Sequence, residues 1–237
     1  MSRMESCLAS TSEPNPMPQP AAYIMTAAMS ESDVLLEGKG LELWRGEHRL
    51  FTRVSFQLRA GELLHIVGPN GCGKTSLLRV LCGLTLPETG EVYWTGKKLA
   101  RNRANFHASM CYLGHRESLK ADLTAEENLV FQLGLRAWLT TAEIEAALEK
   151  VGLSKRRDVP ARSLSAGQKR RVSLARALAS GAKLWILDEP YTNLDVAGRE
   201  LVDTMMSEHL ARGGLVLLVA HQAHGVTGGV KRLLELG

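Results

Sequence analysis

A glycine-rich segment around residue 70 has the composition and spacing of a phosphate-binding loop. Residues Gly68 to Thr75 follow the pattern G-x-x-x-x-G-K-T, between a short apolar run and a stretch with helical periodicity. Glycines let successive backbone N–H groups wrap a dense anion, and the positive end of the following helix points at it. Lys74 is expected to reach the outer phosphates of a nucleotide, and the Thr75 hydroxyl to bind Mg²⁺. The expected ATP-binding residues in this segment are Gly68, Pro69, Asn70, Gly71, Cys72, Gly73, Lys74, Thr75 and Ser76.

Two adjacent carboxylates follow a second apolar run, Leu184–Leu187. At the tip of a strand, Asp188 is expected to hold the hydration shell of Mg²⁺ opposite Thr75. Glu189 is then placed to orient the attacking water, because phosphoryl transfer depends mainly on positioning and charge neutralisation. Taken alone, the pair could equally cap the next turn, since Pro190 follows. Its coupling to a phosphate loop favours the catalytic interpretation.

A third segment, Leu164-Ser165-Ala166-Gly167-Gln168, starts another stretch of helical periodicity. Ser165 is a good helix N-cap, and that structural role needs no partner. A helix start also offers unpaired N–H groups and a favourable dipole to an anion, so both roles can be filled together. The following Lys169, Arg170 and Arg171 are expected to form a solvated basic face of this helix.

His221 follows the apolar run Leu215–Ala220. The carboxyl end of a strand is where a side chain can reach the nucleotide crevice of a parallel sheet. A lone histidine is more often structural. The position of His221 after the carboxylate pair and after Asn193-Leu194-Asp195 favours a role at the nucleotide.

These segments, taken in this order, resemble the nucleotide-binding domain of ABC-type ATPases over residues 34–237. The resemblance implies an ATPase in which Glu189, His221 and Lys74 are catalytic. It also implies a dimer, in which a second copy of the chain presents its signature segment to the γ-phosphate and Asp195 links the two sites. The signature residues expected to act across the dimer are Ser165, Ala166, Gly167 and Gln168, with Ala166 where the family has glycine.

Two candidate site residues lie outside these segments. Trp44, upstream near a strand end, is a candidate for stacking on adenine, a contact worth about 1–3 kcal/mol, and a core tryptophan is the alternative. His115 stands where the family has a glutamine that touches Mg²⁺. Because histidine titrates near neutral pH, metal contact at this position stays open.

His115, Ala166, the segment Leu123–Leu129 and the pair His221-Gln222 resemble one subgroup of the family, the ATP-binding subunits of the cytochrome c maturation complex, also called haem exporter ATPases. This resemblance implies an energy-coupling subunit of a transporter, with ATP and Mg²⁺ as cofactors. It implies peripheral attachment to integral membrane transporter subunits at the cytoplasmic face of the cell inner membrane. Haem is implied only indirectly, and the chain has no C-x-x-C-H motif.

Other function classes are weighed against this one. An ABC ATPase of another small export system is the alternative that stays open. A soluble ABC ATPase acting on DNA or ribosomes usually carries coiled-coil insertions or tandem cassettes, and this chain has neither, so no nucleic-acid partner is expected. A P-loop kinase leaves Leu164–Gln168 unexplained.

Composition indicates an ordinary globular protein. With 237 residues, of which 45% are apolar and 23% charged, the chain is long enough for a large core. A formal charge of +4 suits a nucleotide site or an anionic membrane surface and does not require nucleic acid. No apolar run approaches the roughly 20 residues that cross a bilayer. The 4 cysteines show no metal-ligand spacing.

The elements that position these residues follow from hydrophobic periodicity. Residues 1–33 are expected to be a disordered leader, and residues 34–237 an ABC ATPase domain with a helical subdomain at about 116–179. The expected fold class is α/β, a P-loop NTPase core with a parallel sheet, an antiparallel β subdomain and the helical subdomain. The expected strands are Val34–Trp44, Arg53–Leu58, Leu63–Val67, Glu91–Thr95, Leu184–Leu187 and Leu215–Ala220. The expected helices are Lys74–Leu84, Ala125–Trp138, Thr141–Val151, Ser165–Leu178 and Val196–Ala211.

Overall fold

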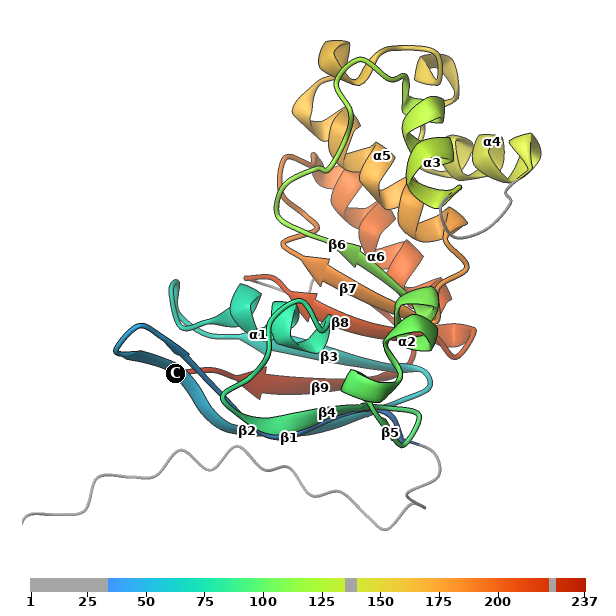
Figure 1. Ribbon diagram of the computed structural model, residues 1–237. Coiled ribbons are helices and arrows are strands. Elements are labelled where there is room, and N and C mark those ends of the chain that lie inside the picture. Colours follow the sequence, from blue (N-terminus) through green and yellow to red (C-terminus); the bar gives the residue numbers. More distant parts are fainter. Residues whose placement is uncertain (1–33, 135–139, 222–224) are drawn as a thin grey trace, which may run out of the picture.

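The computed structural model describes residues 34–134, 140–221 and 225–237. Three features named from the sequence lie outside the described residues: the leader at residues 1–33, the helix end at Trp138, and Gln222. The described chain forms two β-sheets with helices packed around them (Figure 1). One sheet is parallel and the other antiparallel, which confirms the predicted α/β fold class.

A five-stranded parallel sheet forms the centre of the fold. Its order is β6-β7-β8-β3-β9, with β6 at Met110–Leu113, β7 at Leu184–Asp188, β8 at Leu215–Val219, β3 at Glu62–Val67 and β9 at Val230–Glu235. Every residue of β7 and β8 is buried, because both faces of such a sheet are covered. The strands run parallel, so their carboxyl ends share one edge, and the loops that follow them meet there.

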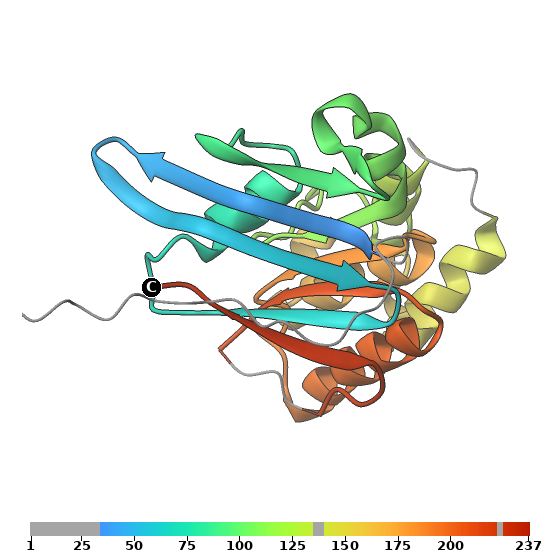
Figure 2. The ribbon, with the colours of Figure 1, turned by 90° about the horizontal axis from the view of Figure 1, so that it is seen from below.

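A four-stranded antiparallel sheet lies on one side of the parallel sheet. Its order is β2-β1-β4-β5, with β1 at Val34–Arg45, β2 at His48–Arg59, β4 at Thr89–Trp94 and β5 at Lys97–Lys98. Figure 2 shows the long β1–β2 hairpin running alongside β3 and β9. Helix α1, Lys74–Leu81, packs in the apolar core between the two sheets, and its residues Leu77, Leu78 and Leu81 are fully buried there.

The longer helices lie on the opposite side of the parallel sheet from the antiparallel sheet. Helices α5 at Ala166–Ala179 and α6 at Val196–Ala211 pack against its strands, and α3 at Ala125–Leu133 and α4 at Thr141–Lys150 pack on α5. A short helix α2 at Arg103–Ser109 leads into β6, and 3-10 turns lie at Leu99–Arg101, Ser154–Arg156 and Ala161–Ser163. A second apolar core joins α5 and α6 to β7, through Leu174, Met206 and Trp185 among others. None of the helices in the described part of the chain combines the length and apolar character that crossing a bilayer requires.

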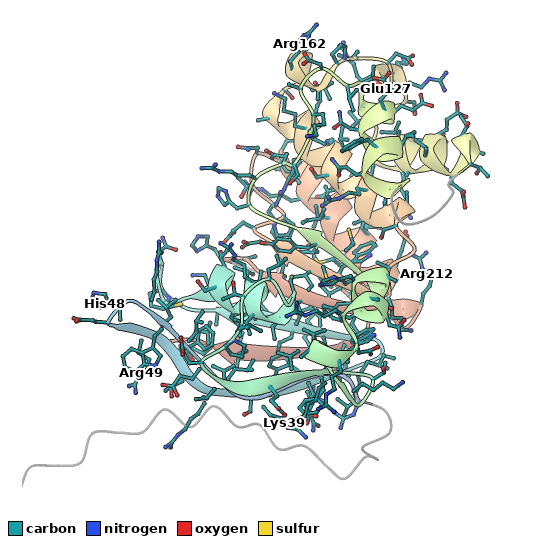
Figure 3. All side chains as sticks on the ribbon, in the orientation of Figure 1. Lys39, His48, Arg49, Glu127, Arg162 and Arg212 are labelled. Carbon is teal, nitrogen blue, oxygen red and sulfur yellow. The ribbon has the colours of Figure 1, made fainter. Side chains whose placement is uncertain are left out.

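Capping boxes define where three of these helices begin. Thr124, Thr140 and Ser165 each accept a hydrogen bond from the backbone N–H three residues on, and the side chain there bonds back to the cap. Each box satisfies two backbone donors that a helix start leaves unpaired. Glu127, the partner of Thr124, lies with Arg162 at the end of the molecule opposite the antiparallel sheet (Figure 3).

The structure corrects several boundaries predicted from the sequence. Helix α1 ends at Leu81 rather than Leu84, since Gly83 follows with a φ of 69° that does not continue a right-handed helix. Strand β2 begins at His48 rather than Arg53. Strands β5, β6 and β9 and helix α2 are absent from the predicted elements. Strand β9 is an edge strand with mostly exposed residues, so it lacks the apolar run that marks a covered strand.

A buried histidine in the second core makes stability depend on pH. The His209 ring stacks on Trp185 with ring centroids 4.0 Å apart, and its Nε2 lies 3.2 Å from the carbonyl oxygen of Lys183. Burial lowers the pKa of His209 from 6.5 to about 4, although the hydrogen bond to Lys183 opposes the shift. The unfolded chain therefore takes up this proton at higher pH than the folded one. The histidine's contribution to stability is complete above pH 6.5 and is lost as the pH falls toward 4.

We expect the free energy of unfolding to fall by roughly 3 kcal/mol between pH 7 and pH 4 on account of this one group. Denaturant unfolding of the wild type and of His209→Gln at both pH values measures it, because the difference between the two proteins isolates the histidine from other titrating groups. An equal pH dependence in the two proteins would contradict the assignment.

Candidate active site

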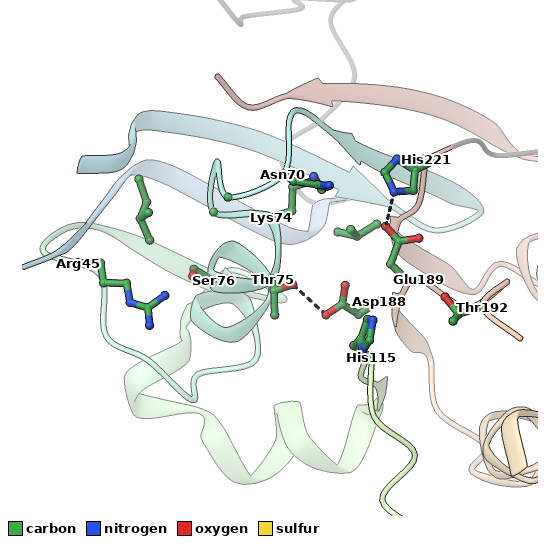
Figure 4. A pocket seen from close by; sticks show the side chains of 14 residues that line it. Arg45, Asn70, Lys74, Thr75, Ser76, His115, Asp188, Glu189, Thr192 and His221 are labelled. Carbon is green, nitrogen blue, oxygen red and sulfur yellow. Dashed lines mark hydrogen bonds and ion pairs between the residues drawn. The ribbon is translucent and has the colours of Figure 1, made fainter. Parts of the chain in front are cut away.

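Loops that follow four parallel strands meet around one cavity. Strand β3 leads into the phosphate loop, β6 into the turn with His115, β7 into Glu189 and β8 toward His221. The cavity has a volume of about 470 Å³ (Figure 4). Its lining residues are Arg45, Leu50, Asn70, Gly71, Gly73, Lys74, Thr75, Ser76, His115, Asp188, Glu189, Thr192, Val219 and His221. The fold thus brings the phosphate loop, the carboxylate pair and two histidines together from distant parts of the sequence.

The phosphate loop presents only part of its length to this cavity. Gly68, Pro69 and Cys72 do not line it. A Cβ on Gly68 would lie 2.2 Å from the carbonyl oxygen of Leu236, and Gly68 has a φ of 149°, so the packing of the segment after β9 requires glycine here. The Lys74 ammonium donates to the carbonyl oxygens of Gly68 and Pro69, at 2.7 and 2.9 Å. To bind a phosphate, the Lys74 ammonium would have to exchange its hydrogen bonds to these two carbonyls for hydrogen bonds to phosphate oxygens.

Thr75 and Asp188 converge at the floor of the cavity. The Thr75 hydroxyl donates to Asp188 Oδ2 at 3.1 Å, although 113 residues separate the two in sequence. Asp188 is almost wholly buried, and burial raises its pKa, opposed by the hydrogen bond from Thr75. A hydroxyl beside a buried carboxylate supplies the oxygen ligands that Mg²⁺ prefers, so these residues fit that ion. His115 also faces this corner (Figure 4).

Within the described residues no group of three or more His, Cys, Asp or Glu side chains is placed to hold a metal ion. Mg²⁺ here would therefore take its other ligands from nucleotide phosphates and water, as is usual for this ion.

Glu189 and His221 face each other across the cavity mouth. The distance between Glu189 Oε1 and His221 Nε2 is 3.9 Å (Figure 4). Glu189 has a φ of 51°, a left-handed conformation that is strained for a residue with a side chain. Its backbone N–H donates to the carbonyl oxygen of Val219 at 2.8 Å, which joins the ends of β7 and β8. This turn aims the carboxylate into the cavity, where it can orient a water molecule.

The signature segment lies elsewhere on the chain. Ser165, Ala166, Gly167 and Gln168 do not line the cavity. Ser165 is the N-cap of α5, and its Oγ accepts from the backbone N–H of Gln168 at 3.2 Å, so the structural role foreseen for it is present. A Cβ on Gly167 would lie 2.8 Å from the carbonyl oxygen of Asn193, so this position needs a glycine for close packing. Ser165 and Ala166 remain exposed.

Asp195 is held within its own chain by two contacts. Its Oδ1 accepts from the backbone N–H of Gly198 at 2.9 Å, which makes it the N-cap of α6, and from Arg171 Nη2 at 3.1 Å. The pKa of Asp195 is lowered, first by the hydrogen bond from Gly198 and also by the charge of Arg171. The side chain is exposed, so it is accessible to another chain.

Trp44 does not line the cavity, whereas its neighbour Arg45 does. Side chains alternate between the faces of a strand, so neighbours at the end of β1 point to opposite sides. The Trp44 indole is partly exposed, donates to Glu42 Oε1 at 3.0 Å and has the Arg49 guanidinium 5.9 Å from its ring centroid. Its stacking on adenine stays a prediction.

Four lining residues have no counterpart in the sequence-based prediction, namely Arg45, Leu50, Thr192 and Val219. Alternation along β1 was the signal that could have drawn attention to Arg45, because it occupies the strand end next to the tryptophan.

The fold and the site together define a class of protein. The sequence matches the ABC transporter family over residues 51–192, which is more than half of the chain. The chain therefore belongs to the ABC transporter family, and within it to the ATP-hydrolysing subunits.

Curated relatives narrow the family further. The cytochrome c biogenesis ATP-binding export protein CcmA of Nitrosomonas europaea is 49% identical over 79% of this chain and 89% of its own length. The proteins of the same name from Methylococcus capsulatus and Dechloromonas aromatica are 47% and 46% identical, over 85% and 86% of this chain and 98% and 100% of their own lengths. The chain is thus a member of the family of cytochrome c biogenesis ATP-binding export proteins.

Solved structures agree with the fold. An ATP-binding subunit of an ABC transporter superposes with a TM-score of 0.71 at 28% identity, covering 79% of each chain. An ATP-binding cassette solved as a dimer in a post-hydrolysis state, bound to ADP and Pi, gives a TM-score of 0.75 at 24% identity, over 85% of this chain and 94% of its own.

Proposed function

We propose that two copies of this chain form an ATP-driven clamp in a cytochrome c maturation complex of the cell inner membrane. The observation that carries this proposal is the 46–49% identity to proteins named for cytochrome c biogenesis over most of the chain. The chain sits at the cytoplasmic face as a peripheral subunit, and its conformational cycle acts on integral membrane partners. Haem enters only through those partners.

The arrangement of the cavity supports a definite division of labour in hydrolysis. Lys74 neutralises charge on the outer phosphates, and Glu189 orients the attacking water. His221, 3.9 Å from the Glu189 carboxylate, contacts the γ-phosphate and the same water. Thr75 and Asp188 would hold Mg²⁺ or its hydration shell, and the ion would supply positive charge against the phosphates.

The position of the signature segment supports the dimer. Ser165 and Ala166 are exposed and lie outside the cavity of their own chain. The N-terminus of α5 nevertheless has the dipole and backbone donors that an anion requires. A head-to-tail pair places this helix start of each copy against the nucleotide of the other, which gives Ser165 through Gln168 a ligand and brings Asp195 to the interface.

Exposed apolar residues on α3 support a membrane partner. Val130 and Phe131 are 50% and 48% exposed, and both lie on α3. An adjacent pair of large apolar side chains on a helix surface favours a protein contact over solvent. We place the contact with the integral membrane subunits on this helix.

Purification of the full chain with its complex tests the proposal. Purification of a tagged chain from detergent-solubilised membranes should yield hydrophobic subunits in stoichiometric amount. A strain that lacks the chain should accumulate c-type apocytochromes without haem. A chain recovered free of membrane proteins from cells with normal c-type cytochromes would overturn the assignment.

We expect Asp188→Asn to raise the Mg²⁺ concentration needed for half-maximal hydrolysis by about 10- to 100-fold, because the buried carboxylate loses its charge. Titration of ATPase activity with Mg²⁺ measures this. Binding of a fluorescent ATP analogue with and without Mg²⁺ gives a readout that does not depend on turnover. Asp203→Asn is the control, since Asp203 is also buried but bonds to Tyr191 outside the site.

A further inference from the structure

Arg170 is a buried cation that the reaction described above does not use. Its side chain is 1% exposed, and it lies on α5 shortly after the signature segment. The basic face predicted for Lys169, Arg170 and Arg171 is therefore wrong for this residue. Consecutive helix positions are 100° apart, so three successive residues cannot all face solvent on a helix that is packed on most sides. A buried guanidinium is costly unless its donors are satisfied.

Backbone carbonyls satisfy the Arg170 guanidinium. Nε donates to Pro190 at 3.1 Å, and Nη2 donates to Asp188 and Glu189 at 3.0 and 2.6 Å. Nη1 donates to Gly114 at 2.9 Å. Burial lowers the pKa of Arg170, opposed by the charges of nearby carboxylates, and an arginine keeps its charge in any case.

These four carbonyls belong to two of the segments that carry cavity residues. Three come from the consecutive residues Asp188, Glu189 and Pro190, and the fourth comes from Gly114, directly before His115. The bond to the Glu189 carbonyl is made at the residue with the strained φ of 51°. A planar guanidinium with five N–H donors in a rigid fork can bridge carbonyls in this way, whereas an ammonium offers three donors on a flexible stem.

We propose that Arg170 is a positioning residue that fixes the Glu189 carboxylate relative to the signature helix and to the turn before His115. This inference rests on the proposed function, because it takes Glu189 as the residue that orients water and Ser165 as the residue that meets the second copy's nucleotide. Arg170 then connects Glu189, which acts at the ATP site of its own chain, with the signature helix, which acts at the ATP site of the second copy. A movement of α5 on dimer closure is transmitted directly to the backbone that carries the catalytic carboxylate.

The test compares Arg170→Lys and Arg170→Gln in the full chain within its purified complex. Misplacing a catalytic group by about 1 Å costs on the order of 100-fold in rate, so kcat should fall about 10- to 100-fold in Arg170→Gln. The KM for ATP should change by less than about 3-fold, because the phosphate loop is untouched. Arg170→Lys keeps the charge and some donors, so its loss of kcat should be smaller.

Arg176→Lys is the matched control. Arg176 lies on the same helix and donates to the carbonyl oxygen of Tyr112 at 2.6 Å, in the strand before Gly114, without touching the Glu189 turn. Its kcat should stay within about 3-fold of the wild type. A folded Arg170→Lys and Arg170→Gln pair with unchanged kcat, or equal losses of kcat in Arg176→Lys, would overturn the inference. If Arg170→Gln does not fold, the inference is tested by comparing Arg170→Lys with Arg176→Lys: a larger loss of kcat in Arg170→Lys supports it, and equal kcat values overturn it.

Glu189→Gln measured in parallel separates this inference from the proposed function. Normal turnover in Glu189→Gln would remove the catalytic role of Glu189, and the inference with it. Loss of turnover in Glu189→Gln beside normal kcat in folded Arg170 variants would remove the inference alone.

Discussion

Glu189→Gln is expected to bind ATP with nearly wild-type affinity and to hydrolyse it at least about 100-fold more slowly. The amide keeps the size and the hydrogen-bonding reach of the side chain, but it loses the negative charge that orients and polarises water in the proposed function. Nucleotide binding depends on the phosphate loop, which the substitution does not touch. Single-turnover hydrolysis and equilibrium binding of ATP, measured on the same preparation, separate the two effects.

The same variant should accumulate as an ATP-bound dimer, because closure precedes hydrolysis in a clamp. Size-exclusion chromatography with ATP and Mg²⁺ should therefore show a dimer that the wild type forms only transiently. Glu200→Gln is the matched control, since Glu200 is an exposed carboxylate on α6 outside the cavity, and it should behave as the wild type. Wild-type turnover in Glu189→Gln would disprove the assigned role.

Ser165→Arg is expected to reduce hydrolysis at least about 100-fold while one chain by itself still binds ATP normally. Ser165 is exposed and lies outside its own cavity, so the bulky cation leaves the local nucleotide contacts intact. In the proposed dimer it blocks the helix start that approaches the nucleotide of the second copy. The Kd for ATP at a protein concentration below dimerisation, measured beside the ATPase rate, shows where the substitution acts.

Loss of the N-cap at Ser165 costs about 1 kcal/mol of stability as well, so thermal unfolding is recorded for each variant. Ser154→Arg is the control, because Ser154 is another exposed serine at the start of a 3-10 turn outside the signature. A Ser165→Arg chain that no longer binds ATP as a monomer would show that the serine acts within its own subunit.

The local sequence pattern was sufficient to predict those parts of the site whose residues lie together in the sequence. The spacing from Gly68 to Thr75 and the apolar run before Asp188 predicted a loop and a strand end, and part of that loop and Asp188 line the cavity. The helix start at Ser165 could also be predicted, because an N-cap and its partner are only three residues apart. Such features depend on residues that are neighbours along the chain, so they can be predicted from the sequence.

The features that the sequence analysis did not predict depend on contacts between residues that are distant in the sequence. Strand β9 is recognisable only through its pairing with β3, and Arg45 enters the cavity only because the antiparallel sheet is placed beside the phosphate loop. Arg170 reads as a solvated residue in its local pattern, yet four carbonyls 18 to 56 residues away surround it.

The amino-acid order therefore sufficed to predict the groups to which the proposed chemistry is assigned, namely the phosphate loop, the carboxylate pair and the helix cap at Ser165, since each is set by a few adjacent residues. The folded chain alone settled which of those groups meet and which charged side chain is buried among them. The reason is that strand order and helix packing join residues far apart in sequence, and no local pattern encodes that distance.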